Sequence, residues 1–420
     1  MALPTQTNRR SLSTEQKIAI LMQQAGHDRE SGGNRQEGVP RDALRPINIR
    51  PLSDRGFGPT KIFRILLSNA CVFSCAYCPM RAGRDLPRHA FPPEKLAEIF
   101  MEARRRGWSE GLFVTSGIPK SPVWAMDRMI ALVELLRFRH RFAGYIHAKA
   151  VAGCREDQLD RLTLLVDRLS YNLESVCQAT LDRVAPEKSL SAGLALMRRA
   201  RRVAAGGSPR LSGDPRPPGP HLGSGITTQI VVGLDSRNDR EILKETFGLW
   251  RDRTIHHSHY AAFRPISDTP LEGRPETPAL REHRLYQADH LLRRYGFEPA
   301  ELEFDDRGNL PFDCDPKMAW ALAHSGSFPI EITTAGREAL RRVPGLGPRG
   351  VERILAERKR WTSLAAHDLT RLGAIASRAA GFLSYRGKRL SIFRGQRALF
   401  GREEVTQAPV VYSFSPGTFR

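Results

Sequence analysis

Strand-like and helix-like segments alternate along this 420-residue chain from about residue 61 to residue 263. Because strands that alternate with helices pair in parallel through right-handed crossovers, this rhythm predicts an α/β fold, a parallel sheet or a partial barrel of six strands. Short apolar runs predict strands at 62–67, 111–115, 145–150, 168–173, 227–232 and 260–263. Amphipathic segments between them predict helices at 93–106, 124–140, 157–165, 190–203 and 239–251.

Three cysteines, Cys71, Cys75 and Cys78, follow the first predicted strand within eight residues. Parallel sheets and barrels place their sites on such loops, at the carboxyl ends of the strands. The spacing does not match the paired C-x2-C halves of a structural zinc site, which also needs a fourth Cys or His. Three thiolates without a fourth instead suit a [4Fe-4S] cluster with one iron free of protein ligands, and the aromatic Tyr77 supports this interpretation.

The other cysteines, Cys154, Cys177 and Cys314, are isolated, so we predict core residues and a reduced compartment. The amino terminus has no apolar leader segment, and no run of about 18 apolar residues occurs in the chain. We therefore expect a cytoplasmic protein that does not associate with membranes.

The chain is strongly basic, with 65 Lys plus Arg against 45 Asp plus Glu, a net charge of +20 and a pI near 10.3. This charge favours a polyanionic partner such as nucleic acid, although the Arg-, Gly- and Pro-rich composition of a high-GC genome is an alternative explanation. Residues 331–420 hold 17 Lys plus Arg and 7 Asp plus Glu, so this part alone has a net charge of +10.

Composition shifts divide the chain into five regions. A Gly-, Pro- and Ser-rich stretch at about 204–225 interrupts the barrel pattern, and we predict a flexible insertion there, a solvated loop rather than a phosphate contact. The predicted regions are an N-terminal tail with one short helix from Ser13 to Gln24 (1–58), the partial barrel (59–300), a connector (301–328), a small all-α domain (329–388) and a basic tail (389–420).

The cysteine motif at 71–78, with an aromatic residue before the third Cys and a strand before the loop, resembles that of the radical S-adenosylmethionine (SAM) enzymes. In that family the free iron of the cluster binds SAM, and one electron cleaves SAM to a 5′-deoxyadenosyl radical that abstracts a substrate hydrogen. The resemblance implies a [4Fe-4S] cluster and SAM as cofactors, and an electron donor such as a flavodoxin or ferredoxin. The protein then positions the cofactor and excludes water, and the sequence names no catalytic residue beyond this.

Two further segments are similar to the cofactor contacts of the family. The second strand ends at Ser116 and Gly117, where the family has Gly-Gly-Glu, so backbone carbonyls remain to accept the amino group of SAM. Asn172 and Glu174 are two residues apart, which would place both on one face of the fourth strand. The resemblance implies that this pair binds the two ribose hydroxyls.

The fifth strand ends at Gly233 and is similar to the apolar strand of the family that lies under the adenine. It departs from the pattern at Gln229 and Ser236, where Gly and Glu are usual. On the third strand, His147 and Lys149 alternate, and they are either substrate-facing residues or ordinary polar residues of a barrel mouth.

Two predicted helices, 335–343 and 348–360, flank Pro344-Gly345-Leu346-Gly347, and this pattern resembles the helix-hairpin-helix motif. The resemblance implies that N–H groups of Gly345, Leu346 and Gly347, at the amino end of the second helix, bind a nucleic-acid phosphate. Arg349 and Arg353 would add charge there. Residues 368–383 repeat the pattern more weakly. The alternative is a helical hairpin used only for packing or protein contact.

A radical SAM barrel followed by a helix-hairpin-helix domain resembles a bacterial family assigned to DNA modification or repair. We therefore expect an enzyme that acts on nucleic acid, DNA in preference to RNA, at a flipped, damaged or single-stranded nucleotide. Two alternatives remain: a radical SAM enzyme that modifies RNA, and a non-catalytic iron–sulfur protein that binds nucleic acid and senses redox state.

Overall fold

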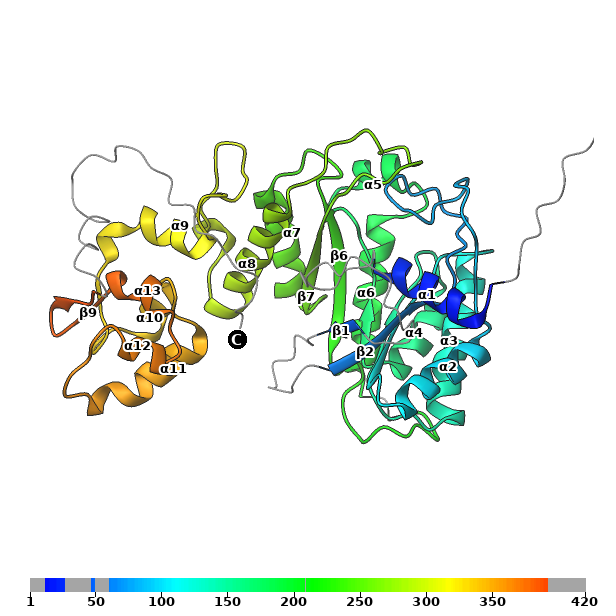
Figure 1. Ribbon diagram of the computed structural model, residues 1–420, viewed down its shortest axis with the longest axis horizontal. Helices are drawn as coiled ribbons and strands as arrows, with labels where there is room; N and C mark the ends of the chain where they lie inside the picture. The colour runs from blue at the N-terminus through cyan, green and yellow to red at the C-terminus, as the bar shows by residue number, and fades with distance from the viewer. Residues whose placement is uncertain (1–11, 27–46, 50–59, 208, 392–420) are drawn as a thin grey trace, which may run out of the picture. The chain divides into compact units, whose positions relative to one another are not determined.

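The computed structural model describes residues 12–26, 47–49, 60–207 and 209–391. Most of the predicted N-terminal tail and basic C-terminal tail lie outside these residues. The chain forms two compact units, residues 1–236 with 248–278 and residues 237–247 with 279–420, which we describe separately (Figure 1). In the part of the chain that the structure describes, none of the helices combines the length and the apolar character that crossing a membrane requires.

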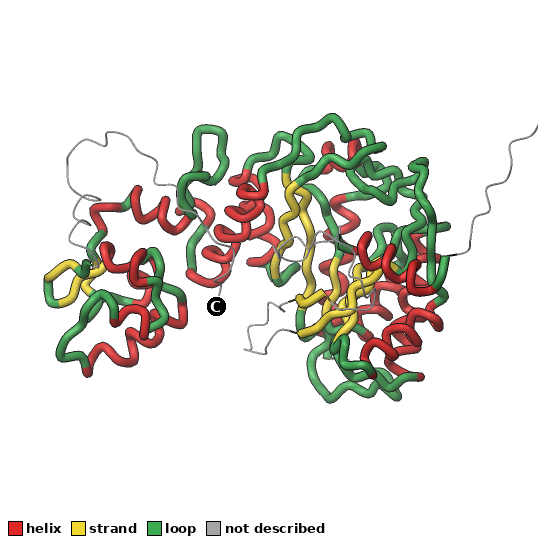
Figure 2. Tube along the Cα trace, viewed as in Figure 1, coloured by secondary structure: helices red, strands yellow, loops and turns green. Residues whose placement is uncertain are grey.

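The first unit is built on a seven-stranded sheet in which the spatial order of the strands follows the chain. The edge strand β1 pairs antiparallel with β2, and the strands from β2 to β7 are all parallel (Figure 2). This confirms the predicted partial barrel of six parallel strands and adds one antiparallel strand that was not predicted. The strands are β1 (Ile47–Ile49), β2 (Thr60–Leu66), β3 (Gly111–Thr115), β4 (Ile146–Lys149), β5 (Arg168–Ser170), β6 (Gly225–Val232) and β7 (His257–Ala262).

Helices connect these strands at the predicted positions, with one addition, the short α5 between β5 and α6. The predicted Ser13 cap is confirmed, because Ser13 and Gln16 cap each other's backbone N–H groups at the start of the first helix. The helices are α1 (Thr14–Ala25), α2 (Pro93–Arg105), α3 (Pro122–Glu134) continued by the π-helix η1 (Leu135–Arg139), α4 (Glu156–Leu165), α5 (Gln178–Val184), α6 (Leu190–Ala205) and α7 (Asp239–Arg251).

The two faces of the parallel sheet differ sharply in polarity. One face carries the apolar core; Phe63 of β2, for example, lies 6.1 Å from the ring of Phe100 of α2, measured between ring centroids. Strand register places polar side chains together on the other face, which we call the polar face. Its polar members are Arg64, Thr115, His147, Lys149, Arg168, Ser170, Thr227, Gln229, His257 and His259.

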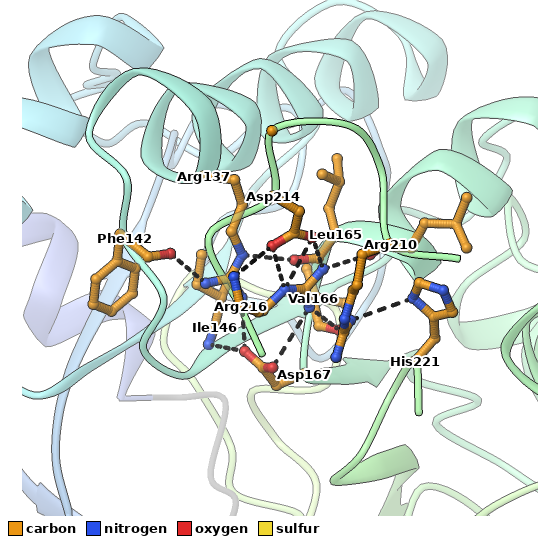
Figure 3. Close-up of polar contacts among 12 residues, drawn as sticks. Arg137, Phe142, Ile146, Leu165, Val166, Asp167, Arg210, Asp214, Arg216 and His221 are labelled. Atoms are coloured by element: carbon orange, nitrogen blue, oxygen red, sulfur yellow. Dashed lines mark hydrogen bonds and ion pairs between the residues drawn. The ribbon is translucent and has the colours of Figure 1, made fainter. Parts of the chain in front are cut away.

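Within the insertion at 204–225, which was predicted to be flexible and solvated, Asp214 and Arg216 belong to a buried ion-pair network (Figure 3). Arg216 is 5% exposed; its guanidinium pairs with Asp214 at 2.6 Å and donates to two backbone carbonyls before β5. The fully buried Arg137 pairs with Asp167 at 2.7 Å and donates to three more carbonyls. Most of the other described residues of this stretch are half-buried or exposed, so its flexibility stays a prediction.

The second unit is mainly helical, but it is not all-α as predicted, because it also contains a small sheet in the order β10–β9–β8. Its strands span two or three residues, too few for a period-two pattern. Besides residues 237–247, which include most of α7, the unit contains the chain from residue 279 onward, and both segments begin inside the region assigned from sequence to the barrel. Its elements are α8 (Ala279–Tyr295), α9 (Pro316–Ala323), β8 (Ile330–Glu331), α10 (Arg337–Arg342), α11 (Pro348–Glu357), α12 (Asp368–Arg371), α13 (Ala376–Ala379), β9 (Leu383–Tyr385) and β10 (Lys388–Arg389).

Candidate cluster, cofactor and hairpin sites

The three cysteines lie together on the loop between β2 and α2. Cys75 is buried, and Cys71 and Cys78 are half-buried. Burial raises the pKa of the Cys75 thiol to about 11, and the neighbouring Cys71 also raises it. Burial likewise raises the pKa of Cys78, with further contributions from Cys75 and Cys71. Because Cys71 acts on both other thiols and Cys75 acts on Cys78, the structure brings the predicted ligands into one neighbourhood.

A buried amide and two half-buried arginines that were not predicted fold this loop. Asn69 is fully buried; its side-chain oxygen accepts from the backbone N–H of His89 at 2.6 Å, which closes the segment between the cysteines and α2. Arg81 donates to the carbonyl of Ser74, between two of the cysteines. Arg88 donates to four backbone carbonyls, at 2.7–3.0 Å, those of Asn69, Met80, Arg81 and Arg84. In the sequence these arginines are indistinguishable from solvated surface charges.

Gly117 supports the loop by a close backbone approach from the end of β3. Its N–H donates to the carbonyl of Ser68 at 2.7 Å, and a Cβ at this position would lie only 2.3 Å from the carbonyl oxygen of Ala70. One residue further on, the carbonyl of Ile118 accepts from the N–H of Val72 inside the cysteine loop. Only glycine fits here, so Gly117 positions the loop; a contact of Ser116 or Gly117 with SAM stays a prediction.

Glu174 forms a buried ion pair beside the cysteines. One carboxylate oxygen lies 2.7 Å from Nζ of Lys188, whose ammonium also lies 3.4 Å from the hydroxyl of Tyr77. The two charged side chains are only 5% and 14% exposed. Burial disfavours the charge of Lys188, but Glu174 and Cys75 outweigh it and raise the pKa of this ammonium. Burial and then Glu174 raise the pKa of Tyr77, so its hydroxyl remains protonated.

Lys188 reaches this position because the segment after α5 packs on the cysteine loop. The N–H of Ala76 donates to the carbonyl of Val184 at 2.7 Å, and the N–H of Ser74 donates to the carboxylate of Glu187 at 2.6 Å. These contacts join the β5–α6 connection to the predicted cluster ligands. Sequence analysis missed Glu187 and Lys188, because neither belongs to a motif and α5 was not predicted.

The strand argument for Asn172 and Glu174 is wrong in its geometry. β5 ends at Ser170, and Glu174 has a positive φ of 66°, so the two side chains do not alternate on one continuous strand. Glu174 is held instead by a backbone bridge to Ile230 of β6. Asn172 is half-buried, and its contact with ribose remains a prediction.

Gly233, at the end of β6, has a structural reason to be glycine. Its φ is +92°, and a Cβ there would lie 1.9 Å from Oγ1 of Thr277. Thr277 in turn donates to the carbonyl of Val232 at 3.0 Å. Nearby, Asp235 accepts hydrogen bonds from the hydroxyls of Ser175 and Thr180 and so ties β6 to the connection after β5. Contact of Gly233 with the cofactor stays a prediction.

The donor set fits the implied cofactors. Among the described residues, no three His, Cys, Asp or Glu side chains surround a single ion position; in a four-iron cluster, however, each thiolate binds a different iron. The second carboxylate oxygen of Glu174 is buried and accepts no hydrogen bond from the described residues. A buried acceptor without a donor is costly, and a hydroxyl or amino group of SAM would satisfy it.

The predicted hairpin lies between α10 and α11. Gly345 has a φ of +78°, Leu346 is buried, and α11 begins at Pro348, as the motif requires. The N–H of Leu346 already donates to the carbonyl of Val343, so this amide is not offered to a phosphate as predicted. Arg349 and Arg353 are exposed, and no ion pair to either is recorded among the described residues. The phosphate prediction therefore rests on the remaining amides and these two arginines.

A second hairpin follows 28 residues later and supports the first. Gly373 has a φ of +83° and corresponds to Gly345. The N–H groups of Gly373, Ala374 and Ile375 donate to the carbonyls of Thr370, Leu369 and Gly345, respectively. The bond to the Gly345 carbonyl joins the second hairpin to the first. Because all three amides already donate within the domain, the second hairpin does not repeat the phosphate contact predicted for the first.

Comparison with known families identifies the first unit. Residues 65–206 match the family described as the radical SAM superfamily. This range contains the three cysteines and the Glu174–Lys188 pair. Residues 65–206 of the chain are therefore similar to the radical SAM superfamily, whose members use a [4Fe-4S] cluster and SAM. A comparison with the curated proteins gives no match.

Similar solved structures include HydG, a maturase of the [FeFe]-hydrogenase, at 15% identity over 54% of this chain and 48% of that chain (TM-score 0.41). Methylornithine synthase (PylB) is 16% identical over 55% of this chain and 60% of its own (TM-score 0.42). HydG from Carboxydothermus hydrogenoformans is 15% identical over 54% and 50% (TM-score 0.37). This chain thus spans about half to three fifths of the length of these structures.

Proposed function

We propose that this radical SAM enzyme acts on nucleic acid, DNA in preference to RNA, and that it modifies or repairs a nucleotide by hydrogen abstraction. When bound, the cluster and SAM would supply a 5′-deoxyadenosyl radical. Cys71, Cys75 and Cys78 would hold the cluster. Tyr77, Glu174 and Lys188 form the buried polar wall beside it, which orients the cofactor and excludes water.

The observation that carries the nucleic-acid proposal is the first hairpin. A glycine with positive φ turns the chain directly into the amino end of α11, where the exposed Arg349 and Arg353 follow. Backbone amides, a helix amino terminus and arginines are the groups that bind phosphates without base selectivity. The net charge of +10 on residues 331–420 supports the same partner.

Binding to DNA across a salt series tests this proposal. In the Arg349→Gln/Arg353→Gln variant, we expect the affinity for a DNA duplex to fall about tenfold or more, with a shallower salt dependence, because phosphate contacts release counterions. Arg105→Gln is the matched control, since it removes an exposed arginine of α2. Equal affinity of the double variant and the control for DNA would refute docking through this hairpin. Competition between the DNA and an RNA of the same sequence decides which polymer the protein prefers.

A further inference from the structure

The ammonium of Lys188 is buried beside the predicted cluster ligands. Its Nζ atom lies 2.7 Å from Oε1 of Glu174 and 3.4 Å from the hydroxyl of Tyr77. In the sequence of the loop, Tyr77 stands between Cys75 and Cys78. The side chain of Lys188 is only 14% exposed, so water and salt screen its charge little. A positive charge is thus held next to the place where the cluster would assemble.

Backbone contacts fix the segment that carries Lys188 to the same loop. The N–H of Ala76 donates to the carbonyl of Val184 at 2.7 Å, and the N–H of Ser74 donates to the carboxylate of Glu187 at 2.6 Å. These two bonds lie on either side of the second cysteine. The position of the ammonium relative to the thiols is therefore set by the fold as well as by its ion pair.

The charges of the ion pair do not cancel at the thiols. Burial is the main cause of the raised pKa of Cys75, and Lys188 is the strongest influence that opposes it. Glu174 acts in the other direction on this pKa, but less strongly. Lys188 also opposes the effect of burial on the pKa of Cys78. As seen from Cys75, the ion pair as a whole is positive.

Stability alone does not explain this pair. Apolar residues of similar volume stabilise a core at least as well as a buried ion pair does. One oxygen of Glu174 holds the ammonium, and the other is buried without a hydrogen bond from the described residues. Buried charges that depart from the apolar pattern of a core are expected at functional sites.

We propose that the ammonium of Lys188 raises the reduction potential of the bound [4Fe-4S] cluster and that Glu174 holds this ammonium in place. Reduction adds one negative charge to the cluster, and a fixed positive charge in a poorly screened place favours that added charge. The cluster is then easier for an electron donor to reduce. This inference rests on the cluster of the proposed function, but not on its nucleic-acid substrate.

A redox titration of the reconstituted full-length protein without SAM, followed by the EPR signal of the reduced cluster, tests the proposal. In Lys188→Met, we expect the ratio of reduced to oxidised cluster at a fixed potential to fall about tenfold, a downward shift of about 59 mV for a one-electron couple. Lys188→Arg retains the charge and should titrate as the wild type does. Lys95→Met, which removes an exposed charge of α2, is the matched control and should also titrate as the wild type does.

A double variant keeps the test decisive if Lys188→Met does not fold. Lys188→Met/Glu174→Gln leaves no buried charge without a partner, and we still expect the ratio to fall about threefold, because the ammonium acts on Cys75 more strongly than the carboxylate does. A double variant with the wild-type potential overturns the proposal, and so does a shift in Lys188→Arg as large as that in Lys188→Met.

The iron and sulfide content of each protein separates this inference from the proposed function. A wild-type protein that assembles no cluster refutes the radical SAM function and this inference with it. A complete cluster whose potential does not depend on the charge at position 188 refutes this inference alone.

Discussion

At the scale of single residues, Glu174 and Lys188 form a buried ion pair beside the predicted cluster ligands. Both side chains are buried beside Cys75 and Tyr77, so each charge depends on the other for its stability. Neither role followed from the sequence. Glu174 was predicted as a ribose ligand from its spacing to Asn172 and from the family resemblance, and Lys188 was not singled out. Ion pairs formed across a loop connection leave no periodic signal.

Replacement of Lys188 by Met should destabilise the protein strongly. The change leaves the Glu174 carboxylate buried without its partner, at a cost of roughly 3–5 kcal/mol in the free energy of unfolding. Urea denaturation of Lys188→Met, Glu174→Gln and the double variant measures the pair by a double-mutant cycle. If Lys188→Met unfolds at the same urea concentration as Lys95→Met, the ion pair contributes nothing.

Glu331 makes the second unit sensitive to acid. Burial opposes its charge, but N–H groups of Gly387, Arg386 and Thr333 and the Thr333 hydroxyl outweigh it and lower the pKa from 4.5 to about 2. A depressed pKa in the folded state gives stability that is present above pH 4.5 and lost as the pH falls toward 2. The protection factor of the Gly387 amide against hydrogen exchange, which divides out the intrinsic pH dependence of exchange, should therefore fall in that window. Glu331→Gln should remove this pH dependence. The control Glu338→Gln, at an exposed position of α10, should retain it. A pH dependence that persists in Glu331→Gln would contradict its assignment to Glu331.

At the scale of elements, the sequence predicted those strands and helices whose apolar residues recur at regular intervals. The apolar runs located all six parallel strands, and the amphipathic segments located most of the connecting helices. Elements without a period were missed: α5, the edge strand β1, the short strands β8, β9 and β10, and the buried pair of Asp214 with Arg216. The cysteine loop was found by its motif, whereas Arg88, which folds it, was not, because its partners are backbone carbonyls that carry no sequence signal.

Gly117 connects β3 to the cysteine loop, so Gly117→Ala should impair cluster assembly. The added methyl group would lie 2.3 Å from the carbonyl oxygen of Ala70, which must move and shift the loop that follows it. We expect less iron and sulfide per protein after reconstitution, by at least half, because misplaced ligands commonly lose tenfold or more in metal affinity. Gly248→Ala is the control, since nothing lies within 4 Å of its added Cβ. Full iron content in Gly117→Ala would show that the close approach is dispensable.

At the scale of the whole molecule, the chain combines a radical SAM domain with a basic helical unit. The fold class followed from the alternation of six predicted strands with helices, and the cofactors followed from the cysteine motif after the first strand. Both signals are local in the sequence. The polar face did not, although His147 and Lys149 were noted, because its charge becomes apparent only when strand register places Arg64 and Phe113 beside them. The substrate class is accordingly a proposal built on the structure.

The central claim is that the three cysteines support radical chemistry directed at nucleic acid. Its most direct test is the formation of 5′-deoxyadenosine by the reconstituted, anaerobically reduced protein, with DNA, with RNA and with neither. We predict that the wild type forms 5′-deoxyadenosine, that DNA changes the rate more than RNA does, and that Cys75→Ala abolishes the reaction. Undiminished formation of 5′-deoxyadenosine by Cys75→Ala, or a rate that neither nucleic acid alters, would contradict the account.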